Sequence, residues 1–178
     1  PCGTLFPYTT LFRSVRMFLK VLDKIRPGTE IVIIGAKSDE QVKTLKEVTK
    51  NPGVNILPWL KHRELETYLE QTKIGVLPLE PTFFNRYLTS PLKLFDYFAY
   101  GIPVIASDMP SLRSLIKEGK TGLFYDHSEE DLAVKINMLL DDSEKWRSMS
   151  ENVYRFASER LWIKRGEFLA AEIRQRFY

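Results

Sequence analysis

Short apolar runs alternate with stretches of helical periodicity along most of the chain. Apolar runs rich in β-branched residues are typical of strands that are covered on both faces of a parallel sheet. Strands are therefore predicted at residues 30–34, 54–57, 74–79, 103–106 and 123–125. Apolar residues at helical spacing, with capping and stop residues around them, predict helices at residues 15–25, 38–50, 61–71 and 91–100.

This alternation is the pattern of a doubly wound α/β domain, in which helices cover both faces of a parallel sheet. Ligands of such domains bind at the carboxyl ends of the strands. From Ser128 onward the pattern is only helical, and a final helix is predicted from about Leu161. We therefore expect a Rossmann-like domain over residues 15–178 with extra helices at its C-terminal end.

Residues 1–14 differ from the rest of the chain, because they follow neither a helical nor a strand period. The string at residues 4–14 resembles a translated sequencing adapter, so residues 1–14 are interpreted as an artefact or a disordered arm outside the fold. The alternative is a genuine extended arm. The only cysteine, Cys2, lies in this segment, and no disulfide or thiol chemistry is expected. A native sequence that begins near Val15 is expected to have lost a preceding domain.

Composition excludes several function classes. The 178 residues are 44% hydrophobic, which suits one globular domain, and no apolar run is long enough to span a membrane. The formal net charge of +3 is mild and the basic residues are interleaved with acidic ones, so nucleic acid is not an expected partner.

Candidate chemistry gathers at the start of the helix predicted from residue 91. Ser90 can cap this helix and Pro91 suits its first position, which leaves a positive pole over residues 89–92 where a phosphate can bind. Lys93 adds a positive charge. Asp96 lies roughly 7.5 Å further along the axis at the standard helical rise, about the separation between a diphosphate and its ribose. The alternative is that Lys93 and Asp96 form only a weak surface ion pair.

The runs at residues 90–107, 30–35, 54–60 and 119–124 resemble the C-terminal half of a retaining glycosyltransferase of family 4. Such enzymes have the GT-B architecture of two facing Rossmann-like domains, and the resemblance covers residues 15–178. It implies that Thr89, Ser90, Pro91, Leu92 and Lys93 bind the diphosphate of a nucleotide-sugar donor, that Asp96 binds the ribose, and that the main chain of Trp59 and Leu60 contacts the base. The alternative for Trp59 is a place in the core.

Two positions depart from the family pattern. The ribose-binding residue is normally Glu, and Asp96 is shorter by one methylene group. A second Glu, which contacts the donor sugar in relatives that have it, is replaced by Leu88. Sugar recognition is then either rearranged onto Asn85, Arg86 or Thr89, or impaired. Arg86 is also a candidate for pairing with the diphosphate, although it can equally be a solvated loop residue.

The resemblance implies a bacterial hexosyltransferase-type enzyme of polysaccharide biosynthesis. It would transfer a sugar from a UDP-, GDP- or ADP-linked donor, with retention, to a glycan or lipid-linked glycan, without a cofactor or a metal ion. It would be cytoplasmic, in peripheral contact with the inner face of the membrane. Because the acceptor-binding domain would precede Val15, the 178-residue fragment is expected to bind donor nucleotide weakly and to be inactive.

Two other functions stay open. A nucleotide-sugar epimerase on the same scaffold would need catalytic acids and a histidine around the sugar, and we interpret His62 and His127 as solvent-facing turn residues. A noncatalytic α/β binding module is the second alternative, in which the run at residues 90–107 is only well packed.

Overall fold

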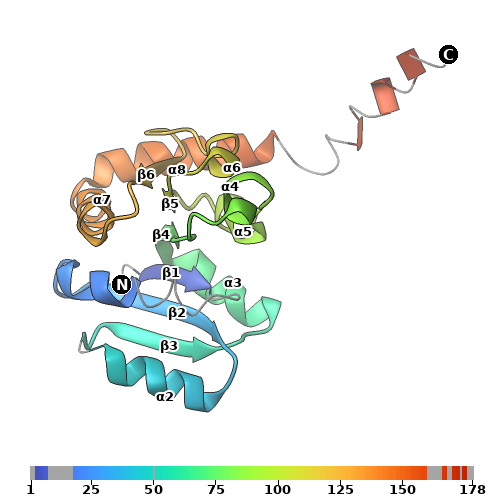
Figure 1. Cartoon of the computed structure of the whole chain (residues 1–178). Helices are drawn as coiled ribbons and strands as arrows, with labels where there is room; N and C mark the ends of the chain where they lie inside the picture. Colours follow the sequence, from blue (N-terminus) through green and yellow to red (C-terminus); the bar gives the residue numbers. More distant parts are fainter. Residues whose placement is uncertain are drawn as a thin grey trace.

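A six-stranded parallel sheet forms the centre of the molecule, seen here in a computed structural model that describes residues 3–7, 18–49, 51–159, 166–167, 170–172 and 174–175. The strand order is β3-β2-β1-β4-β5-β6, the doubly wound order of a Rossmann fold, so the predicted fold class is confirmed (Figure 1). The strands are β1 (Gly3–Pro7), β2 (Glu30–Ala36), β3 (Val54–Pro58), β4 (Thr72–Leu77), β5 (Val104–Ser107) and β6 (Gly122–Tyr125).

Strand β1 corrects the interpretation of the N-terminal segment. Gly3–Pro7 lies in the centre of the sheet, where Leu5 pairs with Val32 of β2 on one side and with Gly75 of β4 on the other. The expectation that residues 1–14 stand outside the fold is therefore wrong for these five residues. The physical reason is that β2 and β4 would otherwise each present an unpaired edge, and any extended backbone that fits can satisfy both. The foreign origin of the segment stays a prediction.

Helices cover both faces of the sheet (Figure 1). Helices α2 (Asp39–Val48) and α7 (Glu129–Asp141) and the 3-10 helix η1 (Leu22–Lys24) pack on one face. Helices α3 (His62–Gln71), α5 (Leu92–Ala99) and α6 (Pro110–Arg113) pack on the other. Helix α8 (Ser143–Ser158) contributes Met149 to the first apolar cluster and Val153 to the second. The predicted final helix from Leu161 lies largely outside the described residues.

The continuous apolar runs of the strands follow from this two-sided cover. Ile31 and Ile33 of β2 belong to the apolar cluster under α2 and α7, while Val32 and Ile34 belong to the cluster under α3 and α5. Successive side chains of a strand point to opposite faces, so burial on both faces requires an apolar residue at each position.

Gly75 of β4 leaves room for the Tyr97 ring of α5 against the sheet. A Cβ atom on Gly75 would lie 2.6 Å from Cδ2 of Tyr97, whose side chain is fully buried. The helix ends at Gly101, which has a φ of 67°, and the hydroxyl of Ser150 on α8 donates to the Gly101 carbonyl at 2.7 Å. Helix α5 is thus held at a fixed height above the sheet and against α8.

Candidate functional site

The candidate site lies at the carboxyl edge of the sheet, where the strand order changes direction between β1 and β4. Residues 78–91 follow β4 and include a short helix, α4 (Phe83–Tyr87), within a segment that we predicted to be a loop. The segment leads into α5, so the predicted phosphate-binding residues lie at this edge (Figure 1). Doubly wound domains bind their ligands at this point, where connections leave in opposite directions and open a crevice.

The start of α5 differs in one detail from the prediction. Pro91, and not Ser90, is the N-cap residue, and no side chain caps the helix. The ψ angle of Pro91 is 113°, so helical geometry begins only at Leu92. The Leu94 amide donates to the Pro91 carbonyl at 3.0 Å, so this N–H is not free for a ligand. The turn before the helix and the positive end of the helix dipole are the parts that would face a ligand. Because Ser90 is exposed and does not cap, its hydroxyl is not needed to hold the helix.

Asp96 and Lys93 are both half-buried on α5, so the alternative of a weak pair on the open surface does not fit. Burial raises the pKa of the Asp96 carboxyl, while the positive charges of His62 and Lys93 act in the opposite direction. Burial lowers the pKa of Lys93 to about 8, and Asp96 partly offsets this. The site therefore holds a partly desolvated carboxylate beside a lysine whose charge is sensitive to mildly alkaline pH.

His62 is the residue of this site that the sequence did not point to. It is the first residue of α3, its side chain is 75% exposed, and its Nε2 lies 3.5 Å from Oε1 of Glu66. Its solvent exposure agrees with the prediction, and its positive charge lowers the pKa of Asp96 on α5. The sequence feature that could have identified His62 is its position shortly after the predicted base-binding segment at Trp59 and Leu60.

The segment between β4 and α5 is fastened to the domain through buried polar groups. Asn85 is only 7% exposed, and its side-chain amide donates to the Glu80 carbonyl at 2.9 Å. The Ser111 hydroxyl donates to the Asn85 carbonyl at 2.6 Å. The Ser107 hydroxyl, which is fully buried, donates to the Leu79 carbonyl at 2.8 Å. These contacts give Asn85 structural partners, and a direct contact of its side chain with a donor stays a prediction.

The outer side of the same segment carries the other predicted residues. Arg86 is exposed and Thr89 is half-buried. Leu88, at the position where the resemblance predicts a sugar-contacting Glu, is 63% exposed, which is high for leucine. Its neighbours Phe83, Phe84, Tyr87 and Leu92 are exposed as well. The structure thus brings Arg86, Thr89, Lys93 and Asp96 to one end of the domain.

Trp59 and Leu60 follow β3 at the same edge. Trp59 is 70% exposed, so its alternative place in the core is wrong. Its amide donates to the Ala36 carbonyl at 3.1 Å, which extends the pairing of β2 with β3 and fixes the backbone at this point. Leu60 packs against the apolar cluster under α3 and α5. Any main-chain contact of Trp59 with a base must then use its carbonyl, because its N–H already has a partner.

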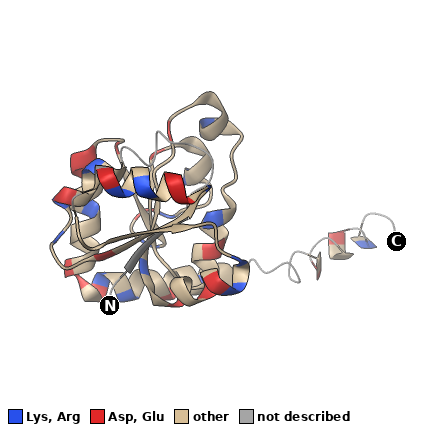
Figure 2. Cartoon of the chain, turned by 90° about the horizontal axis from the view of Figure 1, so that it is seen from below, with Lys and Arg blue, Asp and Glu red and all other residues tan. Residues whose placement is uncertain are grey.

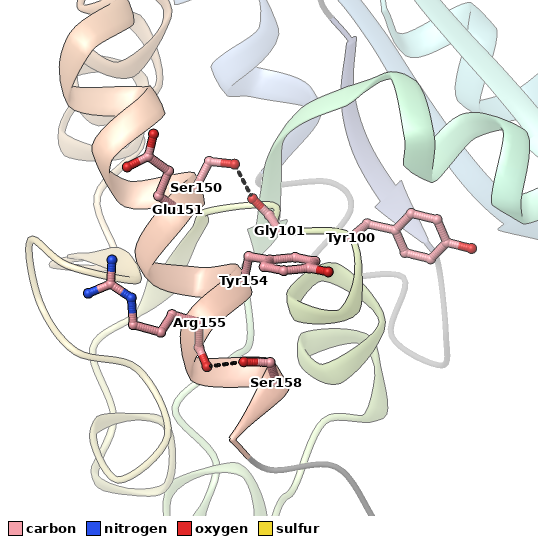
Figure 3. A pocket seen from close by; sticks show the side chains of 7 residues that line it. All are labelled: Tyr100, Gly101, Ser150, Glu151, Tyr154, Arg155 and Ser158. Carbon is pink, nitrogen blue, oxygen red and sulfur yellow. Dashed lines mark hydrogen bonds between the residues drawn. The ribbon is translucent and has the colours of Figure 1, made fainter.

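A cavity of about 620 Å³ lies at the other end of α5, between Tyr100 and Gly101 and the side of α8 (Figure 3). Figure 3 shows the Tyr154 ring projecting from α8 toward Gly101. The cavity begins nine residues beyond Pro91, about 13.5 Å along a standard helix, so it is separate from the start of α5. We place the candidate site at the start of α5 because the charged groups and the strand crossover lie there.

Basic and acidic side chains are mixed on the side of the domain that Figure 2 presents. Lys and Arg are interspersed there with Asp and Glu on the helices of the described part of the chain. Among the described residues, no group of three or more His, Cys, Asp or Glu side chains has the arrangement of a metal site. No helix within these residues is long and apolar enough to cross a bilayer.

The pKa of Lys93 predicts a pH dependence of stability. Its pKa is lower in the folded chain, about 8, than the ordinary value of 10.5. Between these two values the unfolded chain holds a proton that the folded chain has lost, so stability from this group rises with pH. We expect the difference in urea unfolding midpoint between the wild-type chain and Lys93→Met to shift in favour of the wild type from pH 7 to pH 9.5. The control is Lys43→Met, an exposed position on α2. Equal shifts for both variants would contradict the prediction.

The comparison with protein families decides the identity of the domain. The family model described as glycosyl transferases group 1 matches residues 8–142, which is most of the chain. The chain belongs to the glycosyl transferases group 1 family. Among curated proteins, this group 1 chain is 26% identical over 92 residues to the protein named as the teichuronic acid biosynthesis glycosyltransferase TuaH of Bacillus subtilis (strain 168). The aligned part is 52% of this chain and 23% of TuaH, so the chain corresponds to a minor part of that relative.

Solved structures show the same fold for the group 1 domain. HepE of Anabaena in complex with UDP has a TM-score of 0.75 and 17% identity, over 96% of this chain and 48% of HepE. Sucrose-phosphate synthase of Thermosynechococcus elongatus has a TM-score of 0.75 and 20% identity, over 98% of this chain and 45% of that enzyme. These neighbours are GT-B glycosyltransferases, and the group 1 chain spans about half of each.

Proposed function

We propose that this domain binds the nucleoside diphosphate of a nucleotide-sugar donor, and that the enzyme to which it belongs transfers the sugar with retention at the anomeric carbon. The observation that carries the proposal is the half-buried carboxylate of Asp96, placed about one and a half turns beyond the uncapped start of α5 at the carboxyl edge of the sheet. Membership of the group 1 family favours an enzyme over a noncatalytic module.

The proposed roles follow from charge and position. The first turn of α5 and its dipole favour a diphosphate, and Lys93 adds a positive charge beside it. Asp96 accepts hydrogen bonds from ribose hydroxyls, and the segment at Trp59 and Leu60 lies along the base. As the bond from the sugar to the diphosphate breaks, negative charge grows on the leaving diphosphate. Fixed dipoles and cations that already point at this position stabilise it without reorganising.

Two comparisons support this proposal. HepE, which shares the fold, has been solved with UDP and with UDP-glucose. The lipopolysaccharide outer core galactosyltransferase WaaB also shares the fold, with a TM-score of 0.75. Together with the name of TuaH, they favour a surface polysaccharide or its lipid-linked precursor as the acceptor. Whether the sugar is a hexose, and whether this chain alone is inactive, belong to the same proposal.

Calorimetric titration of the chain with UDP, GDP and ADP tests the proposal. We expect saturable binding of one of the three nucleotides. The Trp59 hydrogen bond fixes the proposed base-binding segment, so its hydrogen-bonding groups have one arrangement, which can match only one base well. Uridine, guanosine and adenosine serve as controls for the diphosphate contribution. A chain that is folded by circular dichroism and binds none of the three nucleotides would overturn the proposal.

A further inference from the structure

Helix α4 is too short to hold its own orientation. It has five residues, and isolated helices of this length are unstable in water. The conformational entropy lost in forming the first turn exceeds the stabilisation from its few hydrogen bonds. Its outer side carries Phe83, Phe84 and Tyr87, which are all mainly exposed. Its position must therefore come from the few contacts on its inner side, and Asn85 is the residue of α4 that is buried.

Asn85 is bonded in three directions. Its amide N–H donates to the Thr82 hydroxyl at 3.1 Å, and its side-chain amide donates to the Glu80 carbonyl at 2.9 Å. Its carbonyl accepts from Ser111 on α6 at 2.6 Å. The first two bonds close the segment on itself, and the third ties it to a different element. Removing one partner of such a buried bond leaves the other unsatisfied, which is the costly case.

Helix α6 has only four residues, so it too is held in place by its contacts with the rest of the domain. It follows β5 directly, its Leu112 is fully buried, and Arg113 pairs bidentately with Asp108 through Nε and Nη2 at 2.5 and 2.6 Å. At the end of β5, Ser107 donates to the Leu79 carbonyl just before the segment begins. The chain before α4 and the middle of α4 are thus both held by the end of β5 and the helix after it.

We propose that Asn85 and Ser111 are positioning residues that aim Arg86 at the donor diphosphate. Consecutive residues of a helix point about 100° apart, so turning Asn85 inward fixes the direction of Arg86 on the exposed side. A guanidinium held in one direction loses less conformational freedom when it pairs with a phosphate. The inference rests on the proposed donor-nucleotide function, and it gives Asn85 a role through Arg86 in place of direct contact with the donor.

The test compares UDP with uridine, because only UDP carries the diphosphate that Arg86 would bind. In calorimetry, Arg86→Ala, Asn85→Ala and Ser111→Ala should each weaken UDP binding by about tenfold, the size of one charge-assisted hydrogen bond. Uridine binding should not change. The double variant Asn85→Ala/Arg86→Ala should be no weaker than Arg86→Ala alone, because Asn85 acts through Arg86.

Matched controls separate positioning from loss of stability. Ser114→Ala removes a hydroxyl one turn along from Ser111 that bonds only to the Ser111 carbonyl, at 2.9 Å, and UDP binding should not change. Asn137→Ala removes an asparagine that bonds to Lys24 and Arg26 on the other side of the domain, so it should lower the unfolding midpoint but not UDP binding.

Equal losses of UDP and uridine binding, or additive losses in the double variant, would overturn the inference. Asn85→Ala removes the side-chain bond to the Glu80 carbonyl, whereas Ser111→Ala removes the bond from α6 to the main-chain carbonyl of Asn85. If Asn85→Ala does not fold, Ser111→Ala decides the question, since it tests the link to α6 by itself. A wild-type chain that binds neither UDP nor another nucleoside diphosphate would instead overturn the proposed function.

Discussion

Replacing Asp96 with alanine is expected to weaken the binding of UDP by about 10- to 100-fold. A hydrogen bond to a charged group contributes about 1.5–3 kcal/mol, and each 1.4 kcal/mol is a tenfold change in affinity. The stability of the domain should not fall, because burial raises the pKa of this carboxyl and the folded state therefore disfavours its charge. Calorimetry measures the affinity, and urea unfolding measures the stability of the same samples.

Three further variants sharpen this prediction. Asp96→Glu introduces the residue that the resemblance predicts at this position, and it should bind UDP at least as tightly as the wild type. Asp96→Asn keeps the size but loses the charge, and it should fall between the wild type and Asp96→Ala. Asp141→Ala removes a carboxylate that pairs with Arg26 elsewhere in the domain and should leave UDP affinity unchanged. A lower stability of Asp96→Ala with unchanged affinity would show that Asp96 is only a packing residue.

Gly75→Ala is expected to lower the free energy of unfolding by about 2–3 kcal/mol, at the upper end of what overpacking a core costs. The added methyl group would lie 2.6–2.8 Å from three ring carbons of Tyr97. The Tyr97 ring is fully buried between β4 and α5, and the Gly75 amide donates to the Pro103 carbonyl at 3.0 Å. Neither the ring nor the strand backbone can therefore move easily to relieve the overlap. Urea unfolding measures the loss.

Gly166→Ala is the control, because no atom of the described residues lies within 4 Å of the added Cβ atom, and its effect should stay within about 0.5 kcal/mol. Combining Gly75→Ala with Tyr97→Leu should cost less than the sum of the two single variants, because the smaller side chain removes the overlap. Strict additivity would show that the backbone yields and that Gly75 does not set the height of α5. Because Asp96 adjoins Tyr97, Gly75→Ala should also weaken UDP binding.

Strand β2 could be predicted from the sequence because its burial is two-sided. Successive residues of this strand alternate between two covered faces, so each must be apolar, as are Ile31, Val32, Ile33 and Ile34. A continuous apolar run of this kind can be recognised in the sequence. The helix ahead of Gly101 was equally visible, because a stop at positive φ requires glycine. Fold class and the position of Asp96 on α5 follow from these patterns.

The features that the sequence did not predict depend on contacts between distant residues. Strand β1 has no period of its own and exists because β2 and β4 leave a place for it. Helix α4 depends on the bond from Ser111 to Asn85, which joins residues far apart in the chain. The effect of the His62 charge on the pKa of Asp96 requires α3 and α5 to lie on the same face of the sheet. Local propensity contains none of this information.

The place of β1 also determines the order in which the sheet can be completed. Gly3 pairs with Glu30 on one side but with Thr72 on the other, so β1 can gain its second neighbour only after the chain through β4 has been synthesised. Until β4 has been synthesised, β1 and β2 form a sheet with an open edge, and such contacts between distant residues form slowly. During this interval the nascent chain is most exposed to strand pairing with other chains, and chaperone protection should matter most then.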